Sequence, residues 1–94
     1  MTESEKQILL ICQEECAEVT QAISKVFRFG MDCEYDGRTN YQRLTEEVGD
    51  LICMIDLLME CKILNQIAVQ KAVLEKRSKL MKWSNVFDKE KEVT

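Results

Sequence analysis

The sequence predicts an all-α fold, a small helical bundle with long antiparallel helices that is completed by homo-oligomerisation. Proline is absent and glycine occurs only three times, so few positions interrupt a helix. Apolar residues recur at helical spacing over three segments. With 94 residues, 46% of them apolar and 32% charged, the chain has a globular composition and room for one small core. We therefore expect a single domain over residues 1–94, with a frayed charged tail from about residue 88.

The first predicted helix is also the longest. Two capping boxes could begin it, over residues 2–5 or residues 4–7, because each has a hydroxyl residue followed three positions later by Glu or Gln. Its apolar pattern continues to about Phe29, and Gly30 then favours a C-terminal stop. The polar stretch over residues 31–38 is expected to be a loop.

Two further helices follow this loop. Thr39 and Gln42 form another capping box, which predicts a second helix from Asn40 to about Cys61. Asn65 is the expected cap of a third helix over residues 66–83.

The second helix carries the signal for assembly. Residues 51–55 and 57–59 are apolar on every side of the helix, and only Asp56 interrupts them. A helix that is apolar all round is normally buried all round, which three helices of one small chain can hardly achieve. A second copy of the chain is therefore expected to cover it, in a homodimer or a homotetramer.

Four carboxylates stand where apolar residues would be expected. Glu15 and Glu18 continue the apolar stripe of the first helix at steps of three and four residues. Glu47 and Asp50 lie one turn apart beside the apolar run of the second helix. Converging carboxylates need a cation, a shared proton or basic partners. Because the chain has no histidine, an oxygen-only site favours Mg²⁺, with Mn²⁺ possible. Taken alone, either pair is more typical of a solvated helix face.

Two segments resemble a known family. The stretches EECAE (residues 14–18) and EEVGDL (residues 46–51) are similar to the paired motifs of MazG-type nucleoside triphosphate pyrophosphohydrolases, an all-α superfamily. The second is the more specific, because Gly49 has no helix-propensity reason to be there. The resemblance implies Mg²⁺-dependent hydrolysis of an NTP or dNTP to the monophosphate and pyrophosphate. A metal-activated water would attack the α-phosphorus.

The resemblance also assigns roles to residues. It implies four metal ligands, Glu15, Glu18, Glu47 and Asp50, and two further catalytic carboxylates, Glu14 and Glu46, that orient water or a ligand. Positive side chains on the first and third helices are candidates for binding the substrate phosphates, with a solvated basic face as the alternative: Lys25, Arg28, Lys76 and Lys79. Base preference stays open. Several aromatic residues could stack on a base, although such residues near helix ends more often fill a core: Phe27, Phe29, Tyr41 and Trp83.

Charge and cysteine content exclude other classes. Residues 1–60 carry thirteen acids and five bases, a net charge of −8, whereas residues 61–94 carry eight bases and four acids, a net charge of +4. The acidic part disfavours a nucleic acid polymer as partner. Five cysteines without a CxxC pair disfavour disulfides and zinc. Without an apolar run long enough for a membrane, we expect a cytoplasmic protein, or one of the host cytoplasm if a phage encodes it.

The sequence also has features of a calcium-binding loop and of a non-enzymatic interaction or regulatory module. Residues 32–37 imitate the start of an EF-hand loop, but Arg43 stands where the bidentate Glu would be needed. A non-enzymatic helical module that assembles with itself and binds other proteins is the remaining alternative. It explains the apolar second helix but not acids on core-facing positions.

Overall fold

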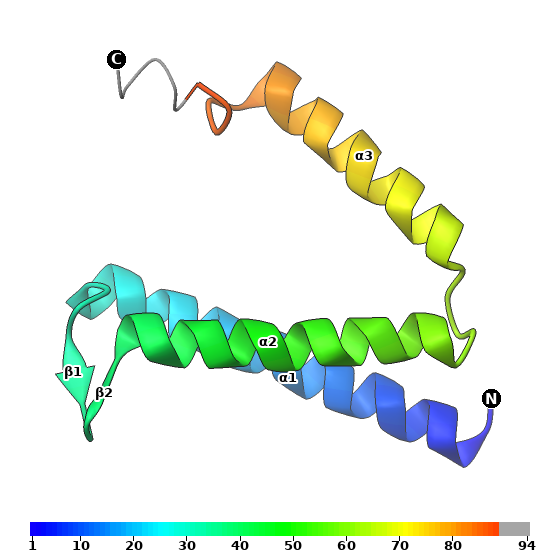
Figure 1. The fold of residues 1–94 in the computed structure, drawn as a ribbon, viewed down its shortest axis with the longest axis horizontal. Coiled ribbons are helices and arrows are strands. Elements are labelled where there is room, and N and C mark those ends of the chain that lie inside the picture. Colours follow the sequence, from blue (N-terminus) through cyan, green and yellow to red (C-terminus); the bar gives the residue numbers. More distant parts are fainter. Residues whose placement is uncertain (89–94) are drawn as a thin grey trace. The chain divides into compact units, whose positions relative to one another are not determined.

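The computed structural model describes residues 1–88, and it confirms the all-α fold. Three helices are joined by short connections, and the only strands in this range form one two-residue hairpin. Contacts divide the chain into two compact units, residues 1–63 and the part that begins at Leu64. The elements, drawn in Figure 1, are α1 (Glu3–Phe29), β1 (Glu34–Tyr35), β2 (Arg38–Thr39), α2 (Asn40–Glu60) and α3 (Gln66–Trp83).

The helices begin at the predicted caps. Thr2 and Glu5 form a complete capping box at the start of α1, so the earlier of the two possible boxes is the one used. Thr39 and Gln42 form the second box, at the start of α2. The Asn65 side chain accepts a hydrogen bond at the start of α3. Each cap satisfies backbone N–H groups that the first turn of a helix leaves unpaired.

The connection between α1 and α2 is more ordered than predicted. The interpretation of residues 31–38 as a plain loop was wrong, because β1 and β2 pair as an antiparallel hairpin inside it. Asp36 and Gly37, at its tip, both have positive φ, 55° and 81°. Two central residues with positive φ make a tight turn whose twist matches that of paired strands, and Asp-Gly is a preferred sequence for it.

Asn40 ties the two long helices together at this end. Its side-chain amide donates to the carbonyl oxygens of Gly30 (2.9 Å) and Lys25 (3.4 Å), at the end of α1. Its backbone N–H donates to the Cys33 carbonyl, and that of Tyr41 to the Met31 carbonyl. Asn40 is buried. The start of α2 is thereby held against the end of α1 and against the hairpin.

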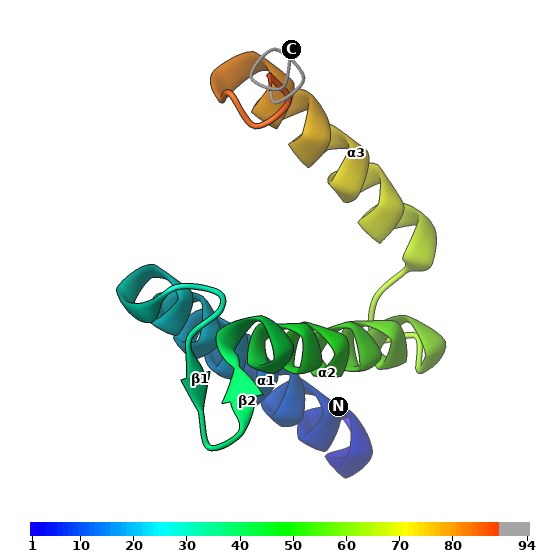
Figure 2. The same ribbon diagram turned by 60° about the vertical axis from the view of Figure 1, so that its left-hand side comes forward.

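Helices α1 and α2 lie antiparallel and side by side in the first unit (Figures 1 and 2). The apolar side chains that are buried within the described residues are few: Ala22, Met54 and Leu58. Ile52 remains 52% exposed in the single chain, although it lies in the apolar run of α2. Covering of this run by a second copy stays a prediction. No helix of the described residues combines the length and the apolarity needed to cross a membrane.

The second unit consists of α3 and a short turn. Ser84 ends α3, and its hydroxyl donates to the Leu80 carbonyl. A turn follows, in which the Asp88 N–H donates to the Asn85 carbonyl. The guanidinium of Arg77 lies 5.0 Å from the Phe87 ring centre. The frayed tail predicted from about residue 88 falls almost wholly on residues 89–94, outside the described range.

Candidate metal centre

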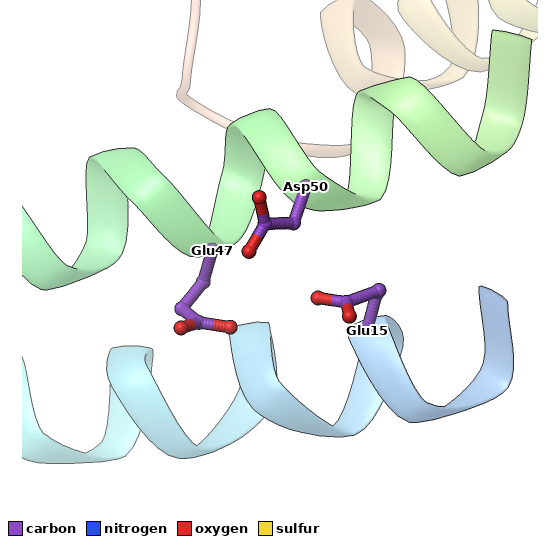
Figure 3. Close-up of side chains that lie close together, drawn as sticks. All are labelled: Glu15, Glu47 and Asp50. Carbon is purple, nitrogen blue, oxygen red and sulfur yellow. The ribbon is translucent and has the colours of Figure 1, made fainter. Parts of the chain in front are cut away.

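Three of the four predicted metal ligands converge between α1 and α2. Glu15 of α1 points toward Glu47 and Asp50 of α2 (Figure 3). One carboxylate oxygen from each residue lies within 4.8 Å of the other two. Glu15 and Glu47 are partly buried, whereas Asp50 is exposed. The convergence follows from the sequence pattern, since all three side chains occupy the faces along which the two helices pack.

Glu18, the fourth predicted ligand, lies beside this cluster. It is exposed and belongs to the lining of a pocket that also includes Glu47. Its negative charge is the strongest electrostatic influence on Glu47. Glu18 thus borders the cluster without belonging to the three converging carboxylates, and its role as a metal ligand stays a prediction.

The electrostatics of the cluster favour a cation. Partial burial, followed by the charges of Glu18 and Asp50, raises the pKa of Glu47 above its ordinary value. Partial burial and then the charge of Asp50 raise the pKa of Glu15 in the same way. Beyond the effect of burial, both shifts reflect repulsion between the ionised carboxylates. A bound cation would remove this repulsion.

The donor set identifies the kind of ion that fits. All the converging atoms are carboxylate oxygens, which are hard ligands suited to Mg²⁺ or Mn²⁺. The chain contains no histidine to support a zinc or di-iron site. The residues present therefore fit a divalent cation of the magnesium type.

A polar pocket of about 130 Å³ adjoins the carboxylates. Two acidic residues, Glu18 and Glu47, line this pocket. Three positively charged residues also line it: Lys25, Arg38 and Arg43. Gln21, Ala22 and Asn40 complete the lining. Carboxylates next to cations can hold a metal ion and the phosphate oxygens that it contacts.

Sequence reasoning missed two of these cations. Arg38 comes from β2, and Arg43 lies one turn before Glu47 on α2. In the sequence, Arg43 served only as an argument against an EF-hand calcium site. Its position one turn from Glu47 on the same helix is the signal that could have identified it. Arg38 reaches the pocket only because of the hairpin, which was not predicted.

The two further predicted catalytic carboxylates differ in their surroundings. Glu46 forms an ion pair with Arg38, which links α2 to the hairpin. Glu14 is exposed, and its charge contributes to the raised pKa of Glu15. A catalytic role for either residue stays a prediction.

The predicted phosphate-binding residues divide into two groups. Lys25 lines the polar pocket, as a phosphate contact requires. Arg28 belongs to neither of the two described pockets, and its guanidinium lies 4.9 Å from the Phe29 ring centre. Lys76 and Lys79 are exposed on α3, in the second unit, and their assignment to the site stays a prediction.

Comparison with known proteins identifies a family for the chain. No curated protein and no solved structure matches the chain significantly. The family described as the MazG nucleotide pyrophosphohydrolase domain, in contrast, matches residues 3–85. The match includes α1, the hairpin, α2 and α3, and with them every carboxylate and cation of the candidate site. The chain therefore belongs to the MazG nucleotide pyrophosphohydrolase domain family.

Proposed function

We propose that the protein hydrolyses a nucleoside or deoxynucleoside triphosphate to the monophosphate and pyrophosphate, with Mg²⁺ or Mn²⁺ as cofactor. The observation that carries this proposal is the juxtaposition of the carboxylate cluster, Glu15, Glu47 and Asp50, with a pocket lined by three cations. Family membership supplies the reaction class, and the geometry supplies candidate groups for metal and phosphate.

In this proposal the carboxylates hold the cation, with Glu18 as a further ligand. When bound, the cation would offset the negative charge of the phosphates and make a water molecule more acidic. Lys25, Arg38 and Arg43 bind phosphate oxygens and orient the triphosphate. Glu46 acts as a positioning residue, because its ion pair with Arg38 holds that side chain at the pocket.

The bond changes in this reaction balance without any other reactant. The oxygen of a water forms a bond to the α-phosphorus, and the bond from that phosphorus to the α,β-bridging oxygen breaks. Pyrophosphate leaves with the bridging oxygen. The proton lost by the water passes to a carboxylate, since the chain has no histidine to receive it.

We further propose that the active form is a homo-oligomer in the cytoplasm. Exposed apolar side chains remain on both long helices of the single chain, including Leu10 and Ile52. Apolar residues exposed in this way are typical of surfaces that assemble. A second copy of the chain would cover them, and light scattering after size-exclusion chromatography measures the copy number.

A product assay tests the activity. The purified protein is incubated with a panel of NTPs and dNTPs, with Mg²⁺ or with chelator, and the products are separated. Monophosphate and pyrophosphate, lost with chelator and in Glu47→Gln, support the proposal. Release of single phosphates would contradict attack at the α-phosphorus. A folded protein that neither turns over nucleotides nor binds Mg²⁺ would instead support the non-enzymatic interaction module.

A further inference from the structure

A second pocket, of about 340 Å³, opens where α1, the hairpin and α2 meet. Its surface is mostly apolar, whereas that of the pocket beside the carboxylates is mostly polar. Its volume falls within the roughly 300–1,000 Å³ typical of small-molecule sites. Its lining residues are Lys25, Phe29, Cys33, Glu34, Tyr35, Asn40 and Arg43.

The two pockets share part of their lining. Lys25, Asn40 and Arg43 line both of them, so a ligand that extends from one to the other would pass these three residues. The acidic residues of the candidate metal centre that reach a pocket line only the polar one, whereas the aromatic residues line only the apolar pocket, together with Glu34. A nucleoside triphosphate has a matching layout, with the triphosphate at one end, the sugar in the middle and the base at the other end.

The same order can be followed along α1. Glu15, Glu18, Ala22, Lys25 and Phe29 follow one another at steps of three and four residues, which places them on one face of the helix. This face spans about 21 Å, at 1.5 Å per residue. An extended ligand lying along it meets acids first, then a cation, then an aromatic ring.

Two aromatic rings of the apolar pocket are accessible. Phe29 is 57% exposed and Tyr35 is 76% exposed. The guanidinium of Arg43 lies 5.6 Å from the Tyr35 ring centre and also donates a hydrogen bond to the Tyr35 carbonyl. These contacts restrain the ring beside a positive charge. Accessible rings next to phosphate-binding cations are typical of surfaces on which nucleotide bases stack.

We propose that the apolar pocket receives the base of the nucleotide, which stacks on Tyr35 with Phe29 as a second apolar wall. This inference rests on the proposed nucleotide hydrolysis and adds a specificity site to it. The two cations that the pocket shares with its polar neighbour suit an anionic ligand with a planar apolar end. The hairpin thereby contributes to substrate binding, as well as connecting two helices.

The test compares a substrate that has a base with a ligand that has none. For the wild-type protein and Tyr35→Ala, KM and kcat are measured with the NTP that the wild type hydrolyses best. The inhibition constant of tripolyphosphate is measured in the same assay. Loss of the ring should raise KM by about tenfold or more, as expected for one stacking contact. The inhibition constant of tripolyphosphate should stay within about twofold.

Matched variants separate stacking from damage to the fold. Tyr35→Phe keeps the ring and should keep the wild-type KM, and Phe29→Ala should raise KM. Tyr41→Ala and Phe27→Ala should leave KM unchanged, because both side chains are exposed but line neither pocket. Far-UV circular dichroism shows whether each variant is folded. If Tyr35→Ala does not fold, the KM of Phe29→Ala is compared with that of Phe27→Ala. A KM raised only in Phe29→Ala would support the base pocket, and equal KM values would contradict it.

The remaining outcomes overturn the proposal in distinguishable ways. Equal effects of Tyr35→Ala on KM and on tripolyphosphate inhibition would mean that the ring acts through the phosphate site. An altered copy number with unchanged KM would mean that a second copy of the chain occupies the pocket. Unchanged values throughout would exclude base stacking there while leaving the proposed hydrolysis intact. Absence of nucleotide turnover in the wild type would refute the proposed function and, with it, the base pocket.

Discussion

The buried amide of Asn40 gives the sharpest prediction about stability. Asn40 is only 6% exposed, and its amide group donates to the Gly30 carbonyl at 2.9 Å and to the Lys25 carbonyl at 3.4 Å. A hydrogen bond contributes about 0.5–1.5 kcal/mol net, and the longer of these two contributes less. We therefore expect Asn40→Ala to lower the free energy of unfolding by about 1–2 kcal/mol. The melting temperature should fall by about 4–8 °C per kcal/mol.

Asn40→Asp separates the effect of the lost amide donor from the effect of charge at the start of a helix. At an exposed first turn, a negative charge stabilises a helix by about 0.3–1 kcal/mol, so helix electrostatics alone would favour Asp. In this structure the substitution replaces the donating amide with an oxygen that faces two carbonyl oxygens. We expect Asn40→Asp to be at least as destabilising as Asn40→Ala.

Thermal unfolding followed by circular dichroism, at pH 7 and at one fixed chain concentration, measures both variants. The fixed concentration matters because assembly makes the melting temperature depend on it. Asn85→Ala, an exposed substitution in the second unit, is the control and should change little. A melting temperature of Asn40→Asp above that of the wild type would refute the reasoning from buried donors.

Three further predictions concern the carboxylate cluster and the hairpin turn. Glu47→Gln should raise the melting temperature of the metal-free protein at pH 7, because it removes a charge that neighbouring carboxylates repel. Because the pKa of Glu47 is raised, the folded state binds protons more readily than the unfolded state does. The free energy of unfolding of the metal-free protein should therefore fall as pH rises above about 4.5. Melting curves recorded with Mg²⁺ should show a weaker fall. Gly37→Ala, at φ 81°, should cost about 1–2 kcal/mol in chemical denaturation, and an unchanged midpoint would contradict strain at that turn.

The helices, and the convergence of three carboxylates between two of them, could be predicted from the sequence because both depend on local patterns. The capping boxes at Thr2 and Thr39 mark two helix starts within one residue. The convergence of Glu15 with Glu47 followed from carboxylates at core-facing positions on two helices that had to pack against each other. The period of the apolar residues predicts which face of a helix each side chain occupies, and therefore which side chains meet when two helices pack.

The hairpin and two of the three cations that line the polar pocket were harder to predict. Asp36-Gly37 is a hairpin signal, but the flanking strands have only two residues each, too few to show an alternating pattern. Arg38 reaches the pocket only through that turn, and no helical spacing connects it to Glu18 or Glu47. The aromatic residues were expected more often in a core. Phe29 is nevertheless accessible, because the buried apolar core within residues 1–88 is small and leaves most rings outside.

The hairpin also has a consequence for how such a protein can diverge. The proposed metal ligands all lie on the two long helices, whereas Tyr35 and Arg38 lie on the connection between them. Short exposed turns tolerate substitution and insertion better than packed helices do. Because Asn40 holds both ends of this connection in place, its tip can vary without disturbing the carboxylates. Substrate preference could then evolve within residues 30–39 while the hydrolytic chemistry on the helices stays the same.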